Sequence, residues 1–129
     1  MLDKILGFIA EKLLLIGTAD SANSNVNITS TNISTMAHGA HVTLTSGTYL
    51  LIAGAAFPTV SGSRNLNVRI GTTSEEWNYQ RISTLDGSWA KLQATEYRTI
   101  TAETTVYCSV SSTKTVNAVQ TGIKAIRLK

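Results

Sequence analysis

The residues best suited to chemistry gather in one short stretch of the chain. The segment Trp77–Arg81 and the nearby Trp89 contain both tryptophans, a tyrosine and an arginine, within a span that we predict to be irregular. Aromatic faces stack on the C–H faces of sugars, and amide and guanidinium groups hydrogen-bond to hydroxyls. We therefore predict that a sugar ligand binds to Trp77, Tyr79, Arg81 and Trp89. The alternative is that either tryptophan plugs the edge of the fold or a subunit interface.

The rest of the sequence offers little for catalysis or metal binding. It has no nucleophile elbow, no phosphate-binding loop, no calcium loop and no zinc-protease helix. His38 and His41 are the only histidines, and they would need further ligands, such as symmetry mates on a threefold axis, to hold a metal. Glu75, Glu76 and Asp86 are expected to be solvated, although a small glycan-acting enzyme that uses one of them is a competing hypothesis. We predict no catalytic residue, no metal, no cofactor and no enzymatic activity.

Composition and charge narrow the class of protein further. The 129 residues suffice for one domain with a real core, and their net charge of +3 comes from scattered Lys and Arg residues. A nucleic-acid site would need these residues clustered, so no nucleic-acid partner is expected. The single Cys108 excludes an intrachain disulfide. Its alternation with Val106 and Val110 predicts a buried, unreactive thiol.

Residues 1–16 differ from the rest of the chain in composition and period. Five apolar residues recur there at spacings of four and three, which is the heptad pattern of an oligomerising helix. They are Leu2, Leu6, Ile9, Leu13 and Ile16. Leucine at a and isoleucine at d favour a trimer or tetramer. A helix packed on its own domain and a membrane-surface helix are the alternatives. Charges at Asp3, Glu11 and Lys12 argue against a signal peptide, and the segment is too short to span a membrane.

The remainder divides into a polar linker, residues 17–25, and a β domain, residues 26–129. Short β-type segments at 8 to 12 residue spacing predict an all-β sandwich of about nine strands. They are Val26–Thr29, His41–Thr45, Tyr49–Phe57, Asn65–Ile70, Ala90–Ala94, Arg98–Thr101, Thr105–Val110, Val116–Gln120 and Ile123–Leu128. The near-continuous apolar run Gly47–Phe57 predicts a central strand buried on both faces. The longest expected irregular segment is Gly71–Trp89.

Several of these segments resemble those of the C1q/TNF-like jelly-roll family. Val42–Phe57 looks like its leading strand, glycine turn and tyrosine-rich inner strand. Asn65–Ile70 falls where the family places its next alternating strand, and Thr105–Val110 resembles its penultimate inner strand. Thr121–Leu128 is similar to its closing strand. The resemblance covers about residues 40–128 and implies a jelly-roll sandwich with a short helical stem.

The resemblance also implies how such a domain assembles. The threonine-rich composition and brief stem are most similar to the trimeric heads of bacteriophage tail fibres, in which one sheet of each subunit meets the others around an axis. Tyr49, Phe57 and Tyr107 are therefore expected at a trimer interface, with an ordinary core position as the alternative for each. The family's acidic-turn motif is present only as Ile100–Thr105, and its collagen-like stalk is missing.

Together these expectations define a function. The resemblance implies a non-enzymatic, homotrimeric head domain of a phage or prophage tail fibre, on the virion surface and outside the cell. It would attach to a bacterial surface glycan by multivalent binding. The competing hypothesis is a purely structural component that trimerises and caps a virion or spore-surface fibre. Neither interpretation calls for membrane insertion.

Overall fold

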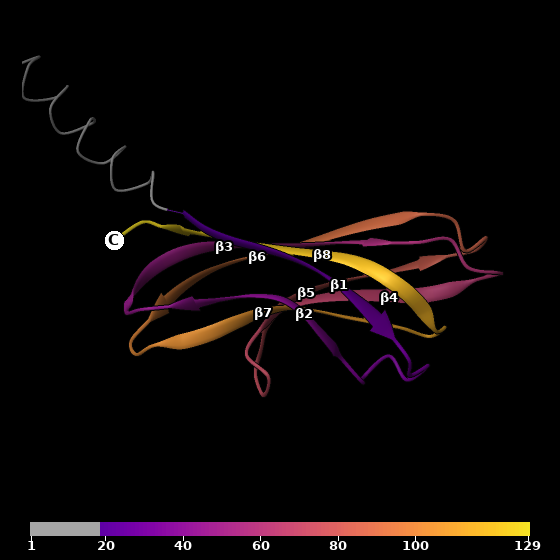
Figure 1. Cartoon of the computed structure of the whole chain (residues 1–129), viewed down its shortest axis with the longest axis horizontal. Helices are drawn as coiled ribbons and strands as arrows, with labels where there is room; N and C mark the ends of the chain where they lie inside the picture. Colours follow the sequence, from indigo (N-terminus) through magenta and orange to yellow (C-terminus); the bar gives the residue numbers. More distant parts are fainter. Residues whose placement is uncertain (1–18) are drawn as a thin grey trace, which may run out of the picture.

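The structure is a computed structural model and describes residues 19–129. These residues form eight β-strands (Figure 1). They are β1 (Ala19–Ile28), β2 (Ala37–Leu44), β3 (Gly47–Phe57), β4 (Arg64–Gly71), β5 (Glu76–Thr84), β6 (Ala90–Ile100), β7 (Thr104–Ser112) and β8 (Val116–Arg127). The first sheet has the order β1-β8-β3-β6 and the second β2-β7-β4-β5, and all strand pairs are antiparallel. Figure 1 shows β3, β6 and β8 in one layer above β2 and β7. This strand order is that of an eight-stranded jelly roll.

The core lies between the two sheets and is built by strand alternation. Every second side chain of β3, β4 and β7 turns inward, and Leu51, Leu66 and Val106 are completely buried. β3 lies between β8 and β6, which confirms it as a central strand. The expectation that it is buried on both faces is wrong, because Leu50 and Ile52 on its outer face are only half-buried.

Tyr49 and Phe57 belong to this core, so their expected place at a trimer interface needs correction. Phe57 is 0% exposed and Tyr49 is 4% exposed. The Tyr49 hydroxyl donates a hydrogen bond to the carbonyl oxygen of Thr45 at 3.0 Å. Both rings are used within their own sandwich and leave no surface for a second chain. Tyr107 differs, since it is half-buried on the outer face of the second sheet.

The expected number of strands is one too high. Ala90–Ala94 and Arg98–Thr101 are joined in β6, and Val116–Gln120 and Ile123–Leu128 are joined in β8. Polar side chains between these pairs suggested breaks in the sequence, but outward positions of a strand tolerate polar residues. The strand β5 was not expected at all.

Two segments expected to be irregular are strands at sheet edges. Residues 19–25 of the expected linker lie in β1, which pairs only with β8. Glu76–Thr84, inside the expected loop, is β5, which pairs only with β4. The stem of residues 1–16 lies outside the described residues. From Ala19 to Lys129, no helix is long and apolar enough to cross a membrane.

Cys108 faces the core from β7, between Val106 and Val110, as the alternation predicts. It is 0% exposed, and its Sγ donates to the carbonyl oxygen of Gly54 at 3.5 Å. Burial raises the pKa of this thiol to about 12 and outweighs a backbone hydrogen bond from Gly122 that lowers it. The thiol therefore stays protonated and inert near neutral pH.

We expect Cys108 to resist thiol reagents in the native protein near pH 8 and to react fully in urea. The unfolded thiol ionises above about pH 9, whereas the native thiol stays protonated up to about pH 12, so this residue's contribution to stability falls as pH rises through that window. The loss amounts to about 1.4 kcal/mol per pH unit. Urea unfolding is measured near pH 7 and pH 10. The free energy of unfolding should fall less between these two pH values for Cys108→Ala than for the parent chain. An equal fall in the two proteins would contradict the raised pKa of Cys108.

Candidate functional site

Four residues lie in a row across the outer face of the first sheet, and the two in the middle are glycines on neighbouring strands. The strand register places side by side Asn23 on β1, Gly122 on β8, Gly54 on β3 and Gln93 on β6. We call these four residues the glycine row. Gly54 and Gly122 leave a bare strip of backbone between the two amide side chains, so the surface is hollowed there.

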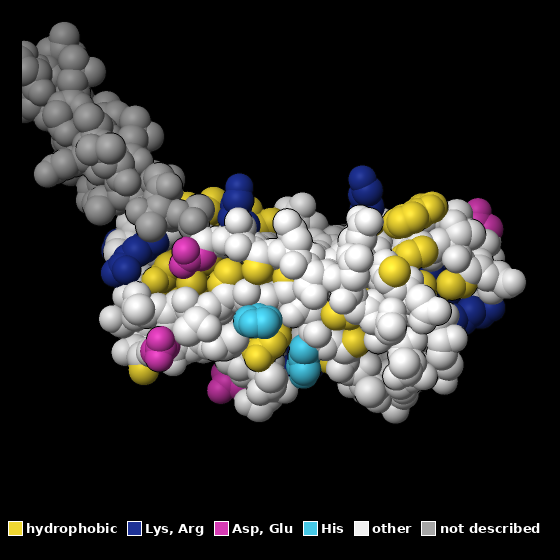
Figure 2. Space-filling model, viewed as in Figure 1, with side chains coloured by type: hydrophobic (Ala, Val, Ile, Leu, Met, Phe, Trp, Pro, Cys, Tyr) yellow, Lys and Arg dark blue, Asp and Glu magenta, His cyan; other side chains and the backbone are white. Residues whose placement is uncertain are grey.

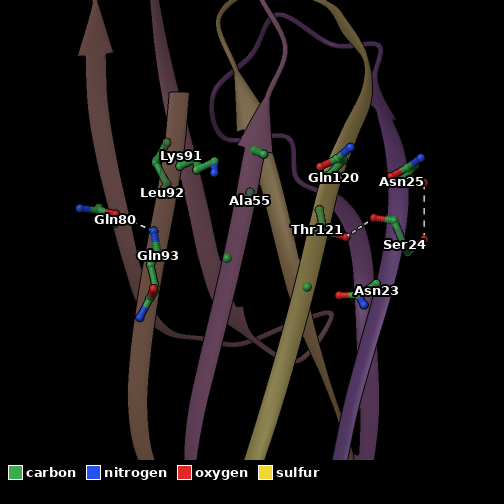
Figure 3. A pocket seen from close by; sticks show the side chains of 13 residues that line it. Asn23, Ser24, Asn25, Ala55, Gln80, Lys91, Leu92, Gln93, Gln120 and Thr121 are labelled. Atoms are coloured by element: carbon green, nitrogen blue, oxygen red, sulfur yellow. Dashed lines mark hydrogen bonds between the residues drawn. The ribbon is translucent and has the colours of Figure 1, made fainter. Parts of the chain in front are cut away.

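The next row along the strands completes a groove over this strip. Its outward residues are Asn25, Gln120, Ala56 and Lys91. The two rows line an open groove with a volume of about 650 Å³. Figure 3 shows Lys91 and Gln93 on one side of the bare central strands and the β1 and β8 amides on the other. The groove therefore crosses the strands of the first sheet.

Gln80 reaches the groove from the second sheet and fixes one of its sides. Its Oε1 accepts a hydrogen bond from the backbone N–H of Gln93 at 2.8 Å, as Figure 3 shows. The neighbouring Asn78 donates from Nδ2 to the carbonyl oxygen of Thr95 at 2.6 Å. These amides occupy backbone groups on β6, an edge strand, which would otherwise be open to another chain. They also tie β5 to β6 and so close the sandwich beside the groove.

Thr121 holds the opposite side of the groove. Its hydroxyl donates to the carbonyl oxygen of Ser24 at 2.7 Å and accepts from the backbone N–H of Ala40 at 2.9 Å. Thr121 is buried and joins β8 to both β1 and β2. Because buried polar groups with full hydrogen bonding rigidify their surroundings, the wall that carries Asn23 and Asn25 is fixed in place.

The chemistry of the groove is that of amides. Five amide side chains line it together with one ammonium group, and none of its lining residues is an acid, a histidine or a cysteine. The amides are Asn23, Asn25, Gln80, Gln93 and Gln120, and the ammonium group is that of Lys91. Each amide offers donors and an acceptor, which suits a ligand rich in hydroxyls. The bare floor allows a flat ring to approach the backbone.

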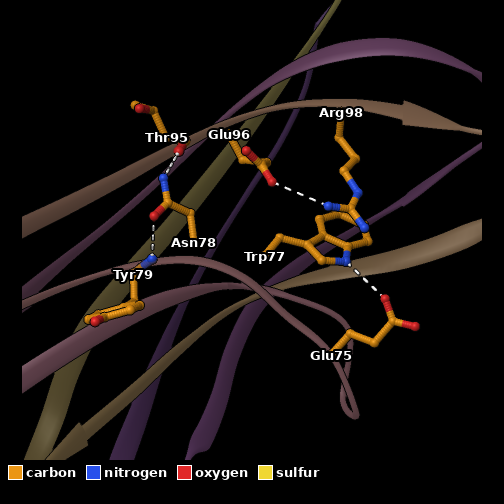
Figure 4. A network of polar contacts seen from close by, with 7 residues as sticks. All are labelled: Glu75, Trp77, Asn78, Tyr79, Thr95, Glu96 and Arg98. Carbon is orange, nitrogen blue, oxygen red and sulfur yellow. Dashed lines mark hydrogen bonds and ion pairs between the residues drawn. The ribbon is translucent and has the colours of Figure 1, made fainter.

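Trp77, the first of the predicted ligand residues, has a structural role. It packs against the core at the side of the sandwich where β5 meets β6. The Arg98 guanidinium carbon lies 4.4 Å from its ring centroid, and its Nε1 donates to Glu75 Oε2 at 3.2 Å. Figure 4 shows this stack, with Arg98 also paired to Glu96 at 3.4 Å. Trp77 thus plugs the edge of the sandwich, which was the alternative interpretation.

The other three predicted ligand residues do not join Trp77 in one site. Tyr79 is 54% exposed, and it points away from Trp77 in Figure 4. Arg81 lies beside it, with the guanidinium carbon 5.9 Å from the tyrosine ring centroid. Trp89 is 58% exposed and follows the far end of β5, about 20 Å along the strand from Trp77. Only Tyr79 and Arg81 are brought together.

The histidines pack against Tyr107 on the second sheet. The ring centroids of His38 and His41 lie 5.3 Å and 5.0 Å from that of Tyr107. His38 Nδ1 shares a 2.7 Å hydrogen bond with the Ser109 hydroxyl. Within residues 19–129, no three His, Cys, Asp or Glu side chains are grouped so that they could hold a metal ion.

The three carboxylates considered for catalysis do not face one another across a cavity. Asp86 Oδ1 accepts hydrogen bonds from the backbone and hydroxyl of Ser88, which lower the pKa of this exposed carboxyl. Glu75 accepts the Trp77 bond described above, and Glu76 is exposed at the start of β5. The hydrogen bonds of Glu75 and Asp86 lie beside the two ends of β5, and none of the three carboxylates lines the groove.

The groove was not anticipated from the sequence, although its signal is there. Four pairs of residues at a spacing of two put small, amide or ammonium side chains on one face of four strands. They are Asn23 and Asn25, Gly54 and Ala56, Lys91 and Gln93, and Gln120 and Gly122. Only the strand register shows that these pairs lie next to one another.

Comparison with known proteins bears on the fold. No model of a known protein family matches the sequence, and neither does any curated protein. Among solved structures, the globular domain of zebrafish complement 1qA is 9% identical with a TM-score of 0.50, covering 86% of this chain and 97% of that domain. The PRD1 vertex protein P5 is 12% identical with a TM-score of 0.54, covering 85% of this chain and 97% of that protein.

A viral structure is a third neighbour. The structure of infectious bursal disease virus Gx strain is 9% identical with a TM-score of 0.52, and the match covers 84% of this chain and 31% of the viral chain. Identities this low establish shared architecture only. The fold of this chain is thus the C1q/TNF-like jelly roll that its sequence resembles, an architecture it shares with virion proteins.

Proposed function

We propose that this chain is a non-enzymatic head domain of a phage or prophage tail fibre that holds a bacterial surface glycan in the groove of the first sheet. The observation that carries the proposal is the set of amides around a glycine floor. A pyranose ring has flat C–H faces and a rim of hydroxyls, and the groove offers a bare floor for the first and amides for the second. The jelly-roll architecture shared with virion proteins supports the particle-surface location.

Multivalent binding would come from self-association as a trimer. Leu50, Tyr97 and Ile126 lie side by side on the outer face of the first sheet, and we call them the apolar patch. Tyr97 is 60% exposed. The patch adjoins Ala19, where β1 begins, so it lies next to the point at which the heptad segment of residues 1–16 enters the domain. Three chains joined there would present three grooves on one rigid body, which raises the effective concentration for each further contact.

The apolar patch also favours a second function, a purely structural component that trimerises and caps a fibre. Such a component would use the patch and leave the groove empty. Mass in solution tests the assembly that both functions share, since three chains of 13.8 kDa give about 41 kDa. A monomer would count against both.

Glycan binding separates the two functions. We expect the full chain to bind at least one member of a panel of bacterial envelope polysaccharides. Replacing Gln93 and Gln120 together by alanine removes two amides, each worth about 1 kcal/mol in hydrogen bonding, and so should weaken each site roughly 30-fold. Asn117→Ala, an exposed amide on β8 outside the groove, is the matched control and should bind as the parent does. A trimer that binds no polysaccharide would establish the structural function instead.

A further inference from the structure

The two faces of the first sheet differ in charge. On its outer face, the outward positions of β1, β8, β3 and β6 hold two lysines, Lys91 and Lys124, and no aspartate or glutamate. Both lysines are exposed. Figure 2 shows Lys and Arg side chains standing out from the upper edge of the molecule, the side on which β3, β6 and β8 lie in Figure 1. The groove therefore lies in a positive, acid-free surface.

The carboxylates of the same strands are turned away from this surface. Asp20 on β1 lines a separate cavity between the sheets, together with Thr43 and Tyr49. Glu96 on β6 points to the side of the sandwich and pairs with Arg98 at 3.4 Å, as Figure 4 shows. Among the described residues, neither Lys91 nor Lys124 forms an ion pair. Their positive charges are left for a ligand to neutralise.

The two lysines lie on opposite sides of the glycine row. Lys91 shares a row with Ala56 on one side, and Lys124 shares a row with Ile52 on the other. Four residues along the strand direction and two strand spacings separate them, which is about 13 Å along the strands and about 10 Å across. A single small anion cannot reach both. A chain that crosses the bare floor and carries negative groups at intervals can.

We infer that the groove binds an acidic polysaccharide, whose anionic groups lie against Lys91 in the groove and Lys124 just beyond its lining, while its hydroxyls bond to the amides of the groove. This inference rests on the proposed function, because it names the class of glycan that the same groove holds. The lysines are solvated, so each contributes little by itself, and their attraction weakens with salt. Amides provide most of the affinity, and the lysines select acidic chains over neutral ones.

The test compares polymers that differ only in charge. Binding of the full chain is measured to a uronate-containing bacterial polysaccharide and to the same polymer after its carboxyl groups are reduced to alcohols. A phosphate-bearing polysaccharide and a neutral one of the same sugars form a second pair, which distinguishes the two sources of negative charge. We expect the acidic member of at least one pair to bind roughly tenfold more tightly at low salt, with the difference shrinking as salt is added.

Substitutions locate the effect in the groove. Replacing Lys91 and Lys124 together by glutamine should abolish the preference for the acidic polymer over the neutral one. Arg81→Gln removes one exposed cation from the second sheet and is the matched control, which should keep the preference. If Arg81→Gln removes the preference instead, the assignment to the groove is overturned.

The remaining outcomes separate this inference from the proposed function. Equal binding of charged and reduced polymers, still dependent on Gln93 and Gln120, overturns the inference and leaves glycan binding standing. Absence of binding to every polysaccharide overturns the proposed function. Tighter binding of single-stranded DNA than of any acidic polysaccharide would show a general polyanion surface and overturn the inference as well.

Discussion

Phe57→Ala is expected to lower the free energy of unfolding by about 3–5 kcal/mol without changing the mass of the assembly. Phe57 is the largest of the fully buried side chains and lies at the end of β3, under the guanidinium of Arg64 at 6.0 Å. Arg64 is itself 3% exposed and donates from Nη2 to the carbonyl oxygen of Ser88 at 2.9 Å. Removing the ring leaves a cavity beneath a buried cation, which surrounding strands cannot readily fill. Urea unfolding at constant protein concentration measures the loss.

This prediction distinguishes a core residue from an interface residue. If Phe57 lay between subunits, as the sequence alone led us to expect, alanine would change the mass in solution and make the stability loss depend on protein concentration. Tyr97→Ala provides the comparison, because Tyr97 is 60% exposed in the apolar patch. We expect it to weaken assembly with little effect on the unfolding of the single chain. A concentration-dependent effect from Phe57→Ala would contradict the placement of this ring in the core.

The fold was largely predictable because its central strands carry clear apolar patterns. β4 and β7 have apolar residues at every second position and β3 is a near-continuous apolar run, and the bounds of all three were close to those expected. The resemblance to the C1q/TNF-like jelly roll added the sandwich architecture, which alternation alone does not specify. Cys108 shows the strength of this kind of reasoning, since its burial follows from two neighbouring valines.

The edge strand β5 and most of the edge strand β1 escaped prediction for a physical reason. β1 and β5 each pair with one neighbour, so most of their side chains face water and their sequences are polar. What fixes β5 against the first sheet is not apolar burial alone but the amides of Asn78 and Gln80, which bond to the backbone of β6. Hydrogen bonds to a backbone group about 15 residues away leave no periodic signal in a sequence. Composition therefore indicated loops where the structure has strands.

The four residues predicted to bind a ligand do not come together in one place. Trp77 and Tyr79 would share a face of a regular strand, but the register of β4 and β5 shifts at Trp77, so Trp77 plugs the sandwich while Tyr79 faces outward. Trp89 lies beyond the end of the strand. The groove has the opposite character, because Asn23 and Gln93 lie on one row although 70 positions separate them in the chain. Register is a property of the folded sheets. It can be read only after the strand order is known.

Gly54→Val is expected to eliminate glycan binding while leaving the fold intact. A Cβ placed at Gly54 would have Leu92 O at 3.7 Å as its nearest neighbour, which is an ordinary contact, so the sheet accepts the side chain without strain. Valine also suits a central strand better than glycine does. Its methyl groups would stand on the bare floor, between the amides of Gln93 and Asn23, and would keep a sugar ring away from the backbone. We expect a loss of affinity of more than tenfold, measured on the polysaccharide that the parent chain binds.

The structural reason for this loss can be tested by adding a similar volume outside the groove. Thr95→Phe enlarges a side chain on the outer face of β6 at a position that does not line the groove, and the backbone carbonyl of residue 95 keeps the Asn78 hydrogen bond. This control should bind as the parent does. Thermal unfolding of both variants checks that the sheet is preserved. If Gly54→Val binds normally and unfolds normally, the ligand does not lie on the bare floor, and the placement of the binding site in the groove is wrong.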